Sequence, residues 1–179
     1  MKEYITMDLE TREQALAYLA QIQPGVRFRV DPFESGWICK EDIPPEENLT
    51  RGLGMASLII DKQTGVVTVQ SSLPTDLVAN EYAEAKRTGS PLPGRQIYPY
   101  QWRITIRRIQ ETSEAIVYHM TTTSLSDPHA PTAEHPLTIE KRTYISNPTD
   151  WLSSVATSHA EWLSRQNQGV WPETATTEV

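Results

Sequence analysis

The densest group of side chains with metal-binding or acid–base chemistry lies in the segment DPHAPTAEH, at residues 127–135. It holds two imidazoles, His129 and His135, and two carboxylates, Asp127 and Glu134. Imidazole and carboxylate groups are common ligands of divalent metals. The segment has two internal prolines and no helical or strand pattern to hold ligands at fixed separations. A solvated loop is therefore favoured over a metal site.

Other reactive residue types occur without the spacing that catalysis requires. The single cysteine, Cys39, stands in a strand-like pattern, which favours a structural thiol over a nucleophile. No serine lies in a G-x-S-x-G elbow or an S-x-x-K arrangement. His119 falls in a strand pattern and His159 on the apolar face of a helix pattern, so structural roles are expected for both. The sequence predicts no catalytic residue, no cofactor and no metal ligand.

Charge and composition argue against nucleic acid and membranes as partners and allow a basic protein. The formal net charge of −7 argues against binding to a nucleic-acid backbone, which depends on Lys and Arg. It permits an acidic surface that docks on a basic partner, although the same charge also serves solubility. No apolar run approaches the roughly 20 residues that span a bilayer, and the N-terminus lacks the apolar core of a signal peptide. We expect a cytoplasmic protein with no membrane contact.

Three helices are predicted. Thr11 to Gln14 fits a capping box for a helix at about 12–23, ended by Pro24-Gly25. A second helix is expected at about 75–88, before Gly89. A third should begin after a cap at Asn147, with Pro148 at the first helical position and Asp150 in the first turn, and continue to about residue 166. The apolar face of this third helix, expected to lie against a sheet, comprises Trp151, Leu152, Val155, Ala156, His159, Trp162 and Leu163.

The remaining periodic segments predict strands. Residues 26–30 and 36–40 alternate on either side of a break at Asp31-Pro32. Residues 58–69, LIIDKQTGVVTV, have the pattern of a hairpin closed by a glycine. Further strands are expected at 100–109, 115–123 and 137–145. The fold class is α+β: mainly antiparallel sheet packed against about three helices, with hairpin–helix units at 55–88 and 101–166.

One compact domain is expected over residues 1–166, since the proline-rich stretch 90–99 is too short for a flexible linker. That stretch is nevertheless the best candidate for a boundary between halves. Residues 167–179 form a polar tail that should fray, with Trp171 tucked back.

The hairpin and the helix after it carry an ordered set of motifs. An apolar strand enters D-K-x-T-G, a V-V-T-V strand follows, then a Ser-Leu-Pro junction and a helix with a Glu-Tyr pair. These are Asp61, Lys62, Thr64 and Gly65, then residues 66–69, 72–74 and 81–82. The combination resembles the immunity protein 35 family, also called the YrhB-like domain. The similarity covers about residues 7–88, and residues 89–179 depart from it.

The resemblance implies a small α+β protein of a bacterial conflict system, which binds and neutralises a cognate toxin and is not an enzyme. The alternative is a non-inhibitory adaptor or structural module of a bacterial secretion or phage system. An enzyme that uses the histidine segment at 127–135 is a third reading.

A toxin-binding surface is expected around the acidic loop that begins at residue 41. Its acidic residues, Glu41, Asp42, Glu46 and Glu47, resemble a run of phosphates that a nuclease, deaminase or ADP-ribosyltransferase toxin would recognise. Trp37 lies just before the loop and is a candidate anchor. The competing interpretation is a solvated loop and a core tryptophan.

Overall fold

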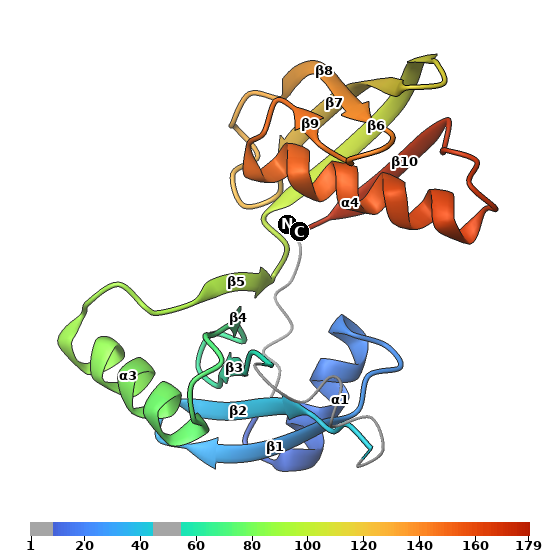
Figure 1. Ribbon diagram of the computed structural model, residues 1–179. Coiled ribbons are helices and arrows are strands. Elements are labelled where there is room, and N and C mark those ends of the chain that lie inside the picture. The colour runs from blue at the N-terminus through green and yellow to red at the C-terminus, as the bar shows by residue number, and fades with distance from the viewer. Residues whose placement is uncertain (1–8, 45–54) are drawn as a thin grey trace. The chain divides into compact units, whose positions relative to one another are not determined.

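A computed structural model describes residues 9–44 and 55–179 (Figure 1). These residues form three helices and two antiparallel sheets of five strands each, which confirms the α+β class. The chain divides into two compact units, residues 1–99 and 100–179, here called the N-terminal and C-terminal units. Their boundary falls at the end of the proline-rich stretch 90–99. That the chain acts as one domain stays a prediction.

The N-terminal unit is built on an antiparallel sheet in which each strand pairs with its sequence neighbour, in the order β1-β2-β3-β4-β5. Its strands are β1 (Phe28–Phe33), β2 (Gly36–Glu41), β3 (Leu58–Asp61), β4 (Val67–Val69) and β5 (Arg95–Tyr98). The predicted hairpin is thus β3 and β4, with its turn at residues 62–66.

Two helices cover opposite faces of this sheet. Successive strand residues point to opposite faces. Leu58 and Ile60 pack in one cluster with α1 (Arg12–Ile22), whereas Ile59 packs in another with α3 (Thr75–Thr88). Both faces are therefore apolar, and all four residues of β3 are buried.

The first helix has the predicted start. Thr11 Oγ1 accepts a hydrogen bond from the Gln14 amide, and Gln14 Oε1 accepts one from the Thr11 amide, which completes the capping box. The α3 helix ends at Gly89, whose left-handed φ of 69° suits glycine. Both helices are confirmed.

The break expected at Asp31-Pro32 was wrong, because β1 continues through both residues to Phe33. Proline has no amide proton to give a neighbouring strand, so it normally stops a central strand. Here β1 is an edge of the sheet with β2 on one side only. The missing donor therefore costs no ladder hydrogen bond.

The C-terminal unit is a second antiparallel sheet, in the order β10-β6-β7-β8-β9, with one helix. Its elements are β6 (Trp102–Glu111), β7 (Ala115–Ser124), β8 (Ala133–Glu140), β9 (Ser146–Asn147), α4 (Trp151–Gln166) and β10 (Thr174–Glu178). The strand expected at 137–145 is instead the end of β8 and a turn before β9. Within the described ranges, no helix has both the length and the apolar character needed to cross a membrane.

Only one face of this sheet packs into a core. Along β7 the residues alternate strictly between half-buried and buried. Ile116, Tyr118 and Met120 belong to the core cluster that includes Ala156 and Ala160 of α4. The opposite face carries Arg107 and His119, which are cross-strand partners. This is the pattern of an antiparallel sheet with one wet face.

The predicted inward face of α4 was wrong in part. Its buried residues are small: Ser153, Ala156, Thr157, Ala160 and Ser164. Trp151 and Trp162 are instead 44% and 55% exposed. The sheet already fills the core with large side chains, and close packing then requires small side chains on the facing helix.

The C-terminal residues were expected to fray, but they form the strand β10. β10 pairs antiparallel with β6 along its whole length. The Val179 amide donates to the Trp102 carbonyl at 2.9 Å. Trp171 is only 6% exposed and belongs to the core, as predicted. Threonines at 174, 176 and 177 make this polar segment a good strand former.

Candidate functional site

The D-K-x-T-G motif builds the tip of the β3–β4 hairpin around one carboxylate. Asp61 ends β3 and is 2% exposed. Its Oδ1 accepts hydrogen bonds from the amides of Gln63 and Thr64, at 2.9 and 3.1 Å. This is the local pairing that makes Asp a turn residue. Gly65 follows with φ of 69°, a conformation that glycine adopts without strain.

The other oxygen of the same carboxylate ties the hairpin to α3. Asp61 Oδ2 accepts a hydrogen bond from Tyr82 Oη at 3.3 Å and forms an ion pair with Lys86. Burial acts most strongly on the Asp61 carboxyl and tends to raise its pKa. The hydrogen bonds from Lys86 and the two amides outweigh burial, so its pKa lies below the ordinary value. Asp61 is thus a buried anion with every partner in place.

The hairpin tip is also tied to α1. Tyr18 Oη donates to the Gly65 carbonyl at 2.7 Å. Burial, with a smaller contribution from Tyr98, raises the pKa of Tyr18 to about 12, so the phenol keeps its proton. A Cβ at position 65 would lie 3.1 Å from that phenol oxygen. The motif residues therefore hold both helices against the sheet, which is a structural role.

An open depression lies beside this tip, between the β1–β2 turn and α3. It is lined by Glu34, Ser35, Gln63, Ala83, Lys86 and Arg87. Both cations are already paired within the unit, Lys86 with Asp61 and Arg87 with Glu84. The depression thus presents mixed polar groups, which suit hydrogen bonding to a partner surface more than capture of a charged small molecule.

The acidic loop lies at the end of β2. Glu41 is the last residue of that strand and is half-buried, whereas Asp42 is exposed. The Asp42 amide donates to the Arg27 carbonyl at 2.8 Å, which fixes the point where the loop leaves the sheet. Glu46 and Glu47 lie outside the described residues. Of the four predicted contact residues of this loop, the structure thus describes Glu41 and Asp42, at the end of β2.

Trp37 does not accompany these carboxylates on the surface. It is 8% exposed, packs in the core beneath α1, and donates from Nε1 to the Leu9 carbonyl at 2.7 Å. The cause is its place in β2, which has a strand on each side and a helix over this face. The anchor interpretation needs correction, because Trp37 is a core residue, as the competing interpretation held.

The histidine segment does not assemble a metal site in the part of the chain that the structure describes, and no cluster of three or more His, Cys, Asp or Glu residues is found there. His129 lies in a turn where its amide donates to Asp127 Oδ1 at 2.9 Å. Glu134 instead faces His119, with 3.4 Å between Oε2 and Nε2. The solvated loop covers only part of the segment, since His135 lies in β8.

One group of residues superficially resembles a catalytic triad. His135 Nε2 lies 3.4 Å from Ser153 Oγ, and that hydroxyl donates to Asp150 Oδ2 at 2.6 Å. In a triad the carboxylate orients the histidine, whereas here it binds the serine. Ser153 is completely buried, and Asp150 Oδ1 also accepts from the Ser153 amide at 3.0 Å. The arrangement is the N-cap of α4.

The remaining candidate nucleophile is equally enclosed. Cys39 has no exposed surface, and burial, with a smaller effect from Asp31, raises the pKa of its thiol to about 12. A thiol of this kind stays protonated and unreactive. The structural interpretation of Cys39 is confirmed.

The hairpin tip and the elements that it joins are the part of the chain that a known family describes. Residues 10–90 match the family model of the immunity protein 35-like domain. The match supports the resemblance to the immunity protein 35 family that the motif residues indicated. No curated protein and no solved structure matches the chain. Immunity proteins of this kind are generally not enzymes.

The match has a clear structural meaning. Residues 10–90 begin two residues before α1 and end just after Gly89, so they include both helices that Asp61 and Gly65 hold in place. They leave out β5 and the whole C-terminal unit. The part that is similar to the family is therefore the hairpin and its two helices on the sheet, and the C-terminal unit lies outside the match.

Sequence reasoning missed the exposed side of α4. The helical spacing of the large apolar residues predicts that they form the buried face. The small residues at 153, 156, 157, 160 and 164 have equally regular helical spacing, and they are the ones that are buried. The large side chains opposite, on β6 to β8, were the signal that could have identified the small face as the inner one.

Proposed function

We propose that this protein is an immunity protein that binds a cognate bacterial toxin domain in the cytoplasm and neutralises it by protein–protein contact. The family match over residues 10–90 carries this proposal. The motif residues Asp61 and Gly65 make contacts within the N-terminal unit and stabilise its fold. Toxin recognition therefore falls to the surface residues that surround it.

The acidic end of β2 is the first part of that surface. Asp42 is exposed beside half-buried Glu41. Glu41 is the last residue of β2, a strand whose first four residues are buried, and Asp42 follows it directly. Carboxylates on a rigid edge attract a basic partner from a distance and orient it during docking. Toxins that act on nucleic acids or nucleotides, such as nucleases, deaminases or ADP-ribosyltransferases, bind anionic substrates in basic sites. An acidic surface can occupy such a site and exclude the substrate.

The proposal predicts that a toxin domain is encoded next to this chain, and the direct test uses that domain. Expression of the toxin alone should arrest growth, co-expression of the full-length chain should restore it, and the two proteins should co-purify. The Asp42→Lys variant should slow association several-fold at low salt and lose that effect at high salt. Asp76→Lys, at an exposed position on α3, is the matched control and should associate normally.

Failure of the wild-type chain to restore growth or to bind the toxin domain would refute the proposal. Binding without restored growth would favour an adaptor that engages its partner without inhibiting it. Normal association of Asp42→Lys at low salt would leave the immunity function intact and remove this acidic edge from the interface.

A further inference from the structure

The outer face of α4 exposes two tryptophans. Trp151 and Trp162 are 44% and 55% exposed. They are eleven positions apart, which on a helix is three turns and about 16 Å, so they project from nearly the same face. Between them Ser154 and Ser158 are exposed. Tryptophan is highly buried on average, so two on one outer face are unusual.

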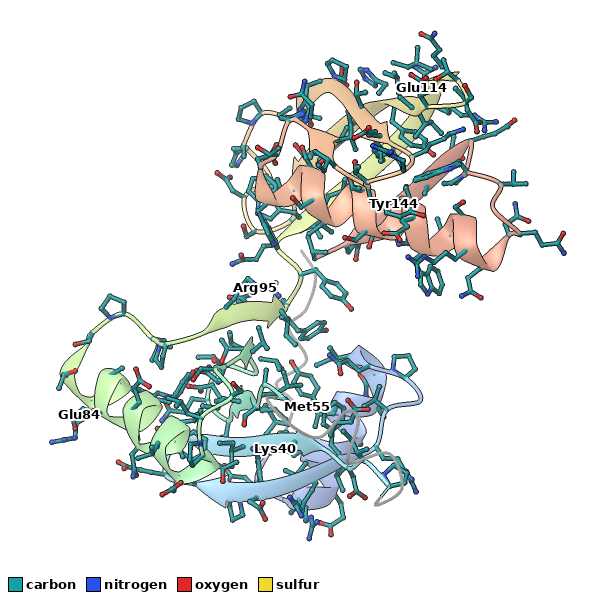
Figure 2. All side chains as sticks on the ribbon, viewed as in Figure 1. Lys40, Met55, Glu84, Arg95, Glu114 and Tyr144 are labelled. Carbon is teal, nitrogen blue, oxygen red and sulfur yellow. The ribbon has the colours of Figure 1, made fainter. Side chains whose placement is uncertain are left out.

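This face continues onto the aromatic residues at the C-terminal half of the helix. The Arg165 guanidinium lies 5.9 Å from the centre of the Tyr144 ring, and Tyr144 is 41% exposed. Figure 2 labels Tyr144 beside α4. We call Trp151, Ser158, Trp162, Arg165 and Tyr144 together the α4 aromatic surface.

Two rings of this surface, those of Trp162 and Tyr144, are held in position before any partner arrives. His159 stacks on Trp162, with 6.2 Å between ring centres and 17° between planes. Tyr144 packs against the buried Trp171, with ring centres 6.4 Å apart. Side chains that are already ordered lose little conformational entropy on binding. Trp, Tyr and Arg are also the residues that most often dominate binding energy at interfaces.

The charge of Arg165, the one cation of this surface, is balanced by Glu161 beside it on α4, although the chain carries −7. The charges on α4 are Glu161 and Arg165, and they pair with each other. Burial lowers the pKa of His159, so its ring is neutral at pH 7. Electrostatic attraction therefore contributes little here, and the complementary surface is an apolar groove without unpaired charges.

The size of the surface indicates what kind of partner fits it. With about 150–250 Å² for a whole aromatic side chain, the exposed parts of Trp151, Trp162 and Tyr144 amount to roughly 300 Å². A standard interface between two different proteins buries about 800 Å² on each side, of which a little over half is apolar. An obligate homodimer needs a larger and more apolar area. The area favours a separate protein over a second copy of this chain.

We propose that the α4 aromatic surface is a second toxin-contacting surface, which inserts Trp162 into an apolar, uncharged groove of the toxin domain. This inference rests on the proposed immunity function. It gives the C-terminal unit a role that the family match does not assign, since that match ends at residue 90.

The test measures binding of the full-length chain to a non-toxic variant of the neighbouring toxin domain. Trp162→Ala should weaken binding by about 30-fold, the usual size of a hot-spot effect. The loss should appear as faster dissociation and persist at high salt, unlike that of Asp42→Lys. Leu77→Ala on α3 truncates a side chain that is 52% exposed and is the matched control, with binding expected within 2-fold of wild type. Melting temperatures of both variants should equal that of the wild type.

The outcomes separate the two proposals. Normal binding of Trp162→Ala to a toxin that the wild type neutralises overturns this inference and leaves the immunity function standing. No binding by the wild type overturns both. A wild-type dimer in sedimentation that Trp162→Ala dissociates would assign the surface to a second copy, and overturns the inference as stated.

Discussion

The two units use the same antiparallel sheet in different ways. In the N-terminal unit a helix covers each face, so β3 is buried along its whole length. In the C-terminal unit α4 covers one face, and β7 alternates between buried and half-buried residues. The difference teaches that helices on both faces bury a strand along its whole length, whereas the C-terminal unit has a helix on one face of its sheet only (Figure 1).

The largest expected losses of stability come from alanine substitutions at adjacent residues, two on β3 and two on β7. Ile59→Ala and Ile60→Ala should each lower the free energy of unfolding by about 3 kcal/mol, because both side chains are fully buried under different helices. In β7, Ile116→Ala should cost as much, but Val117→Ala only about 1 kcal/mol or less, since Val117 lies on the uncovered face. Urea unfolding followed by circular dichroism measures all four. Equal losses at 116 and 117 would mean that the second face is also covered.

The next effect concerns the ion pair that joins hairpin and helix. Asp61→Ala should cost about 3 kcal/mol, because it leaves Lys86, Tyr82 and two turn amides without their acceptor. Asp42→Ala, at an exposed carboxylate of the same unit, should change stability by less than about 0.5 kcal/mol. A loss at Asp61 no larger than at Asp42 would remove the claim that this motif residue anchors the scaffold.

Acid should weaken the N-terminal unit through the same residue. The folded pKa of Asp61 lies below its unfolded value of about 3.9. Its stabilising contribution is therefore complete above that unfolded value and is lost as pH falls through the folded one. Between pH 5 and 2 the wild type should lose more stability than Asp61→Asn. Glu111 and Asp150 also have lowered pKa values but are unchanged in the variant, so the difference between the two curves reports Asp61. Parallel curves would contradict this assignment.

Local signals predicted the N-terminal unit well. The capping box at Thr11, the glycine end of α3 and the D-K-x-T-G turn all depend on neighbours within a few residues, and each forms as expected. The side chain that gives the turn its importance could not be foreseen, since the pairing of Asp61 with Lys86 spans 25 positions. Proline in β1 was misread because its tolerance depends on the strand lying at an edge, which only the assembled sheet defines.

The C-terminal unit was harder to predict because its deciding contacts are distant in sequence. β10 is a strand only because β6, about 70 positions earlier, offers it an edge. The orientation of α4 depends on the bulk of side chains on three other strands. For the candidate site, the sequence predicted an exposed Asp42, left Trp37 open between a surface anchor and a core residue, and placed Trp162 on the buried face of its helix. The structure places Trp37 in the core and exposes Trp162. Periodicity locates an apolar face, and packing partners decide which face is buried.

The smallest expected effect tests how α4 is held, in contrast to α3. In the N-terminal unit α3 is joined to the hairpin by a buried ion pair, whereas α4 has a terminal cap in which Asp150 accepts bonds from the amide and hydroxyl of Ser153. Asp150→Ala should cost about 1 kcal/mol, and Asp150→Asn less, because an amide oxygen still caps the helix. Thr149→Ala, at the exposed preceding position, is the control and should be neutral. A loss at Asp150 as large as that at Asp61 would show that His135, close to the same serine, makes this cap part of a buried network, and the two helices would then be anchored alike.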